Sequence, residues 1–105
     1  MGLREEYFAG DESYSNLQRA LLADPESGPV MPGCNGLRKI RWPDPRRGMG
    51  KRGGLRIIYL HVPEKQVILF IKVYDKNEID NLTPSEQKEL AVFAEELRRV
   101  ALLRR

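Results

Sequence analysis

A short connection between two strand-forming segments limits what this chain can fold into. Leu55–Val62 and Val67–Tyr74 consist mainly of β-branched, aliphatic and aromatic residues, and four residues, 63–66, separate them. This spacing predicts a β-hairpin with its turn in those four residues. Both alternating sets of side chains in the second segment are largely apolar, which is typical of a strand covered on both faces. We therefore expect Val67–Tyr74 to lie centrally in a sheet.

One further strand and two helices are expected around the hairpin. The strand covers residues 37–42, and an amphipathic helix covers residues 12–23, where Tyr14, Leu17 and Leu21 recur at helical spacing. A second helix begins at Thr83-Pro84-Ser85-Glu86, which combines an N-cap threonine, a proline at the first position and a glutamate at the third. Its apolar stripe consists of Leu90, Phe93, Leu97 and Ala101.

The size and composition of the chain fit one globular domain over residues 1–105. Hydrophobic residues make up 41% of the chain and charged residues 31%, as in ordinary soluble proteins. No apolar segment approaches the length of a membrane span, and the N-terminus lacks the apolar core of a signal peptide. The single cysteine, Cys34, excludes an internal disulfide and favours a cytoplasmic location, and we interpret it as a small residue without a chemical role.

Positive charge is concentrated in one part of the sequence. Residues 36–60 contain eight Lys or Arg against one acidic residue, a local charge of +7, whereas the whole chain carries +3 and the remainder therefore −4. Glycines in the loop at 48, 50, 53 and 54 let the backbone approach a phosphate closely. Such a patch indicates an anionic partner, although charged loops also serve simply as solvated surface.

Three motifs in a fixed order carry a resemblance to a known family. GLRKIRW, GKRGGLRIIYL and VYDKNEIDNLTPSE make the stretch from about Ala23 to Gln87 resemble the HigB-like branch of the RelE superfamily of bacterial toxins. The resemblance implies a small α+β fold, a mainly antiparallel sheet of three to four strands with an N-terminal helix or helices and a C-terminal helix. It also implies an mRNA endoribonuclease that acts in the ribosomal A site with no metal or other cofactor. The implied partner is an antitoxin encoded beside it, expected to be a helix-turn-helix protein.

The same resemblance implies a catalytic site made of basic residues. Lys39 and Arg41 match two basic positions on the family's second strand, Arg56 matches an arginine after the loop, and Lys76 matches the basic position after the last strand. Lys39 and Arg41 share one strand face, and Arg56 converges with them if the two strands pair across the loop. Arg56 is then expected to clamp a phosphate, and Lys39 or Lys76 to exchange protons.

Other residues are expected to contact RNA without taking part in the chemistry. These are Arg38, Arg46, Arg47, Lys51, Arg52 and Tyr74. We assign Lys51 and Arg52 to the ribosomal RNA backbone. Tyr74 has two interpretations, since it could stack on a base or could pack at the end of its strand.

Familiar acid–base groups are scarce in the sequence. His61 is the sole histidine, which excludes a two-histidine ribonuclease, and its position within a strand favours a satisfied or exposed side chain. Some RelE proteins carry a participating tyrosine just before the C-terminal helix, where this sequence has Leu82 or Thr83. Catalysis would then depend on the basic residues alone.

Relative to the family pattern, the chain begins inside the first helix and lacks the first strand. We therefore expect an open sheet edge that recruits a second copy of the chain, giving a homodimer, or a segment of the antitoxin. Two alternative functions remain open on the sequence: a ParE-like toxin that inhibits DNA gyrase without nuclease activity, and an inactive shortened remnant that still binds antitoxin. The cluster of Lys39, Arg41 and Arg56 favours the ribonuclease.

Overall fold

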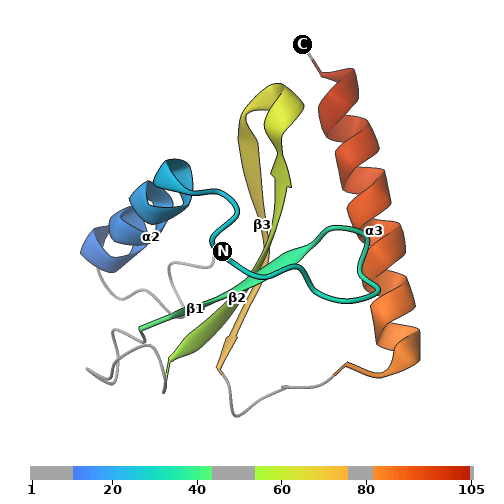
Figure 1. The fold of residues 1–105 in the computed structure, drawn as a ribbon, viewed down its shortest axis with the longest axis horizontal. Coiled ribbons are helices and arrows are strands. Elements are labelled where there is room, and N and C mark those ends of the chain that lie inside the picture. Colours follow the sequence, from blue (N-terminus) through green and yellow to red (C-terminus); the bar gives the residue numbers. More distant parts are fainter. Residues whose placement is uncertain (1–10, 44–53, 76–81, 105) are drawn as a thin grey trace.

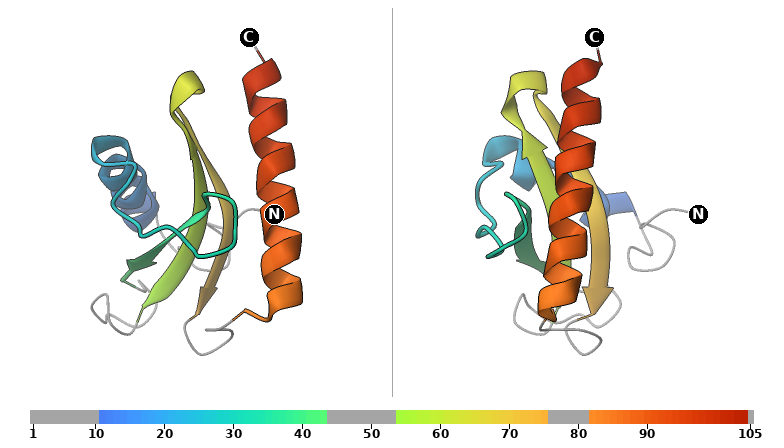
Figure 2. Two further views of the ribbon diagram at one scale, coloured as in Figure 1. Left: turned by 45° about the vertical axis from the view of Figure 1, so that its right-hand side comes forward. Right: turned by 90° about the vertical axis from the view of Figure 1, so that its right-hand side faces the viewer.

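Three antiparallel strands form one sheet that lies between two helices (Figures 1 and 2). The computed structural model describes residues 11–43, 54–75 and 82–104. In chain order, the elements are α2 (Asp11–Ala23), β1 (Arg38–Trp42), β2 (Leu55–Val62), the 3₁₀ turn η2 (Pro63–Lys65), β3 (Val67–Asp75) and α3 (Pro84–Leu103). Helix α2 covers one face of the sheet and α3 the other. The expected small α+β fold, with an N-terminal and a C-terminal helix, is confirmed.

The predicted hairpin is present, but its second strand is not central. β2 and β3 pair antiparallel from Val62 opposite Val67 to Leu55 opposite Asp75, and Gln66 closes the turn in the left-handed conformation with φ 53°. The order β1-β2-β3 makes β2 the central strand of the described sheet. β3 is apolar on both faces because a helix covers each face, not because a strand lies on each side. Sequence alternation reports covered faces and carries no information about edges.

An irregularity in β3 changes which face its last residues occupy. The pairing shifts between Ile58 and Tyr59, so that Lys72 lies opposite Ile58 and Phe70 opposite Tyr59, and Ile71 is the extra residue. A β-bulge of this kind breaks strict alternation along the strand. Phe70 therefore packs on the α2 side, while Lys72 and Tyr74 lie on the α3 side. Without the bulge all three would share one face.

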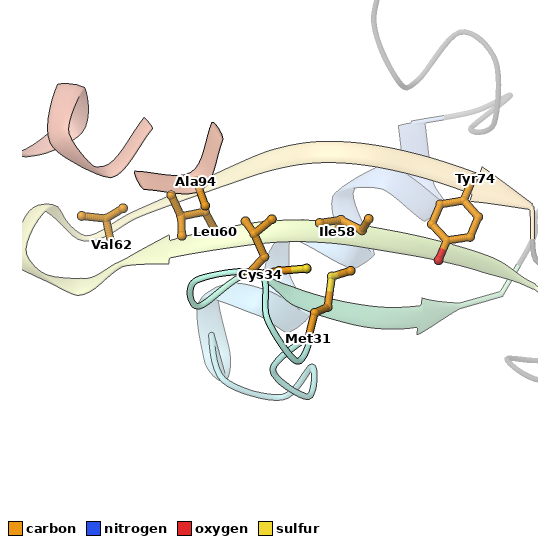
Figure 3. Close-up of a cluster of buried hydrophobic side chains, with 8 residues drawn as sticks. Met31, Cys34, Ile58, Leu60, Val62, Tyr74 and Ala94 are labelled. Carbon is orange, nitrogen blue, oxygen red and sulfur yellow. The ribbon is translucent and has the colours of Figure 1, made fainter. Parts of the chain in front are cut away.

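The two faces of the sheet carry separate cores. On the α2 side, Leu17 and Leu21 meet Ile57 and Tyr59, as expected from the amphipathic pattern of the helix. On the α3 side, the buried residues come from the loop before β1, from β2 and β3, and from Ala94 on the helix; they include Met31, Cys34, Leu37, Ile58, Leu60, Val62 and Tyr74 (Figure 3). The loop before β1 thus contributes buried side chains to the same core as α3.

Helix α3 starts as predicted but presents a slightly different stripe to the sheet. The Thr83 hydroxyl accepts from the Glu86 backbone N–H at 3.1 Å, and the Glu86 carboxylate accepts from the Thr83 backbone N–H at 2.9 Å. This reciprocal capping box confirms the predicted start. Ala94 is fully buried, whereas Phe93 remains 47% exposed at the edge of the interface. No helix in the described ranges is long and apolar enough to cross a membrane.

The side chain of Tyr59 fastens the loop after α2 to the sheet. Its hydroxyl donates to the Pro25 carbonyl oxygen at 2.7 Å and accepts from the Gly28 backbone N–H at 3.0 Å. A Cβ at Gly28 would lie 3.0 Å from the Tyr59 ring, so a larger residue there would push the loop away. Arg38 holds the same loop from β1, donating to the Gly28 carbonyl at 2.8 Å.

Tyr59→Phe should therefore destabilise the fold. The change removes one hydroxyl from a fully buried ring and leaves the Gly28 N–H and the Pro25 carbonyl without that partner. We expect the free energy of unfolding to fall by about 1–3 kcal/mol, measured by urea denaturation with an unchanged slope. A loss below about 0.5 kcal/mol would show that this pair of hydrogen bonds does not hold the loop.

Cys34 should be an unreactive thiol in the folded chain. It is 1% exposed, and burial raises the pKa of the Cys34 thiol despite the nearby charge of Lys39. The unfolded chain therefore ionises first as pH rises above the ordinary value of 9.0, and Cys34 contributes a loss of stability there. We expect a steeper fall in the free energy of unfolding as pH rises above about 9 for the wild type than for Cys34→Ala. Equal slopes would contradict this.

Candidate functional site

The pairing of β1 with β2 brings three predicted catalytic residues to one face. Arg41 lies directly opposite Arg56, and Lys39 lies opposite Ile58, two residues along each strand. Residues opposite one another in an antiparallel pair project from the same face. The convergence of Lys39, Arg41 and Arg56 that we expected from pairing across the loop is therefore present, on the face that α3 partly covers.

The third strand extends this group across the sheet. Tyr74 lies opposite Arg56, and Lys72 lies opposite Ile58. Lys39, Arg41, Arg56 and Lys72 together form what we call the cationic face. Arg41 and Lys72 are exposed, whereas Lys39 and Arg56 are partly buried. Four positive charges within two strand spacings repel one another, so this face favours an anion between them.

One nitrogen atom of the Arg56 side chain lacks a hydrogen-bond acceptor. Its Nη1 is buried and has no hydrogen-bond partner, and it is the sole such side-chain atom in the part of the chain that the structure describes. An unpaired buried donor costs on the order of 1–3 kcal/mol, more if it is charged. Arg41, directly opposite, adds like-charge repulsion. A phosphate bound beside the Arg56 and Arg41 guanidinium groups would offset their repulsion.

Arg38 does not join the cationic face. It lies opposite Tyr59, on the side of the sheet that α2 covers. Its Nη1 donates to the carbonyl oxygens of Glu26, at 3.2 Å, and Gly28, at 2.8 Å. The geometry gives Arg38 a structural task in place of the RNA contact expected from the sequence. The other expected positions, Arg46, Arg47, Lys51, Arg52 and Lys76, lie outside the described residues.

Tyr74 is part of the core. It is 5% exposed and belongs to the buried cluster under α3, where Figure 3 shows its ring beyond Ile58 along the sheet. Of the two interpretations left open by the sequence, packing describes this position, because a ring so covered offers no free face to a base. The buried Tyr74 side chain therefore lies on the strand position opposite Arg56.

A hollow lies between β3 and the first turns of α3, beside the cationic face. It has a volume of about 320 Å³ and is lined by Ile58, Lys72, Tyr74, Leu82, Glu86, Glu89, Leu90 and Phe93. We call it the β3–α3 hollow. A second hollow of about 360 Å³ includes Lys39 and Gln87 in its lining, and Leu82 borders both. Leu82 thus forms part of the lining of both recesses.

Two carboxylates in the β3–α3 hollow were not expected from the sequence. Glu86 and Glu89 lie three residues apart on α3, and this spacing places them on one helix face. Glu86 is engaged in the helix cap, whereas Glu89 is exposed. The spacing was visible in the sequence, but only the packing of α3 on the sheet shows which residues the pair faces. Lys72 also lacked an assigned role before its register was known.

Neither His61 nor Thr83 contributes to this group. His61 projects from the opposite face of β2 from Arg56, because their positions differ by an odd number. The Thr83 hydroxyl is engaged in the capping box, and Leu82 is apolar. Among residues 11–43, 54–75 and 82–104, no cluster of three His, Cys, Asp or Glu has the arrangement to hold a metal ion. The charged groups that the described residues bring together here are the cations of the strands and the two carboxylates of α3.

No model of a known protein family matches the chain. The relation to RelE toxins is therefore a proposal carried by the three motifs and by the residues that the strand register brings together.

The two arginines of adjoining strands should respond oppositely to the same substitution. Arg56→Met keeps an aliphatic stem and removes an unpaired buried donor, so we expect the free energy of unfolding to rise by about 1 kcal/mol. Arg38→Met removes the hydrogen bonds to Glu26 and Gly28, so it should lower that free energy by about 1 kcal/mol.

Inorganic phosphate provides a second measurement on the same proteins. It should raise the melting temperature of the wild type and of Arg38→Met, and leave that of Arg56→Met unchanged. Thermal unfolding with and without phosphate measures both effects. A destabilised Arg56→Met protein that still responds to phosphate would mean that Arg56 is a structural residue.

Proposed function

We propose that this chain is a RelE-like toxin, an mRNA endoribonuclease that acts on the ribosome and is neutralised by a cognate antitoxin. The observation that carries the proposal is the unpaired buried Nη1 of Arg56 in a row with Arg41. A buried hydrogen-bond donor without an acceptor is costly to a small domain, and such unsatisfied groups are concentrated at functional sites. A phosphodiester supplies the missing acceptor.

The proposed reaction is attack of an RNA 2′-hydroxyl on the adjacent phosphorus. The 2′-oxygen–phosphorus bond forms as the bond from phosphorus to the 5′-oxygen breaks, which leaves a cyclic phosphate and a free 5′-hydroxyl. Negative charge accumulates on the two non-bridging oxygens in the transition state. Arg56 presents a rigid fork of donors to these oxygens, and Arg41 faces the same place from β1.

Proton transfer in this scheme falls to a lysine. Lys39 shares the face of Arg41, is partly buried and lines the second hollow, so it approaches the scissile phosphate from the side away from Lys72. Its ammonium would donate a proton to the departing 5′-oxygen, and the 2′-hydroxyl proton would pass to solvent or to a ribosomal group. Lys76, the other lysine implied by the family, lies outside the described residues.

The proposed partners and location follow from the same assignment. A ribosome-dependent toxin acts in the cytoplasm on ribosome-bound mRNA. β3 has a strand neighbour on one side only within the described sheet, which supports the expectation of an edge that accepts an antitoxin segment or a second copy of the chain.

Induced expression in a host strain, followed by primer extension on cellular mRNA, tests the proposed activity. We expect growth arrest and cuts aligned with codons in translated regions. Arg56→Ala should lose about 2–4 kcal/mol of transition-state stabilisation, roughly 30- to 1,000-fold in cleavage rate, while ribosome binding weakens far less. Arg19→Ala, an exposed arginine on α2, is the matched control and should cleave like the wild type.

Three results would contradict the proposal. Equal losses of binding and cleavage in Arg56→Ala would make Arg56 an RNA anchor and not a catalytic residue. Signalling of DNA damage without mRNA cuts would point to gyrase inhibition. The absence of any growth effect would point to an inactive remnant.

A further inference from the structure

We propose that the β3–α3 hollow binds one nucleobase that carries an amino group, from the RNA whose phosphate contacts Arg56. This inference rests on the proposed function and adds a specificity site to it. It assigns a role to three residues that the catalytic scheme does not use: Phe93, Glu89 and Lys72.

The position of the hollow relative to Arg56 fits a single nucleotide. Tyr74, which lines the hollow, lies directly opposite Arg56, and neighbouring strands are about 4.8 Å apart. A base attached to a phosphate beside the Arg56 guanidinium group would therefore need to reach across one strand, over β3. The volume of about 320 Å³ is at the lower end of small-molecule sites, which span roughly 300–1,000 Å³. The hollow thus suits a base-sized ligand.

The walls of the hollow supply the contacts that an unstacked base needs. Ile58, Leu82 and Leu90 form apolar surface, and Tyr74 closes the side towards the sheet. Phe93 is 47% exposed although it lies beside the fully buried Ala94, so one aromatic ring remains open at the rim. Single-stranded RNA is recognised largely by stacking of splayed bases on such rings.

The charges around the hollow favour a base over the sugar–phosphate backbone. Glu89 is an exposed carboxylate in the lining, and it repels phosphate but accepts from the amino groups of adenine, cytosine or guanine. Uracil has no amino group. Lys72, exposed on the opposite wall, can donate to a ring acceptor of the same base or to the next phosphate. Cations on the strands and carboxylates on α3 therefore set the direction in which a nucleotide lies.

Binding of labelled single-stranded RNA hexamers to the purified chain tests the site. We would measure anisotropy at low salt with oligo-A, oligo-C and oligo-U. The wild type should bind oligo-A and oligo-C roughly tenfold more tightly than oligo-U, because one good polar contact to a base contributes about that much discrimination. Glu89→Gln should abolish this preference, because the amide both accepts and donates.

Variants of Phe93 separate stacking from simple apolar contact. Phe93→Ala should weaken binding of all three hexamers by roughly tenfold. Phe93→Trp should retain affinity, and Phe93→Leu should behave like the alanine variant because it has no ring face. Val92→Ala is the matched control, since Val92 is 67% exposed on the next position and is not part of the lining. All of these sites are exposed, and a melting temperature checks each fold.

The possible results distinguish this inference from the function on which it rests. Wild-type affinity in Phe93→Leu, or an unchanged base preference in Glu89→Gln, would overturn the base site and leave the proposed mRNA cleavage standing. Loss of a protein partner in Phe93→Ala with unaltered RNA binding would also overturn it, and would make the hollow a protein contact. The absence of codon-aligned mRNA cuts in cells would remove the proposed function, and the base site with it.

Discussion

The β-bulge at Ile71 decides which residues meet on the α3 side of the sheet. It occurs where β3 passes from the Phe70 pair to the Lys72 pair, and it turns the last part of the strand over by one position. Regular alternation would have placed the Lys72 ammonium under α2, among Leu17, Leu21 and the aromatic rings of that core. Burying a charge there would cost several kcal/mol. The bulge instead brings Lys72 and Tyr74 beside Arg56, and it creates the wall of the β3–α3 hollow.

The positive and negative charges of the site lie on different elements. Strands carry the cations, and their register fixes the spacing between Lys39, Arg41 and Arg56. Helix α3 carries the carboxylates, and the capping box at Thr83 fixes where its first turn begins. Backbone hydrogen bonds fix the positions of the strands and of the helix. Among the described residues, no salt bridge joins the four cations to Glu86 or Glu89. The positive charges of the cationic face therefore repel one another, which lowers the stability of the free protein and favours the binding of an anion.

Local signals in the sequence predicted most of the fold. The hairpin turn, the capping box and the stripe of Leu17 and Leu21 each follow from a few consecutive residues, and the structure contains all three. The convergence of the three basic residues also followed, because period-two alternation and antiparallel pairing leave little freedom. The bulge was not predicted, since Lys72 interrupts the run of strand-forming residues but no glycine or proline marks an extra residue.

Tertiary packing accounts for the remaining differences. Arg38 reads in the sequence as one more cation of the patch, yet the loop after α2 supplies carbonyl oxygens that occupy it. Phe93 and Ala94 are adjacent on a helix, and only the angle at which α3 crosses the sheet decides which of them is buried. The central position assigned to β3 was wrong because an apolar pattern on both faces reports the two covering helices and does not show how many strands pair with β3.

The hydrogen bonds of Tyr59 also have a consequence for the order of assembly. Helix α2 and its following loop are synthesised before β2, yet Leu17, Leu21, Pro25 and Gly28 find their partners on β2. β1 likewise has only a local bridge, between Val30 and Arg38, until β2 emerges. Residues 11–42 therefore leave the ribosome before the strand on which they pack, and their apolar side chains are covered only once the hairpin is complete. The hairpin, whose contacts are close in sequence, is the natural nucleus on which the earlier segment condenses.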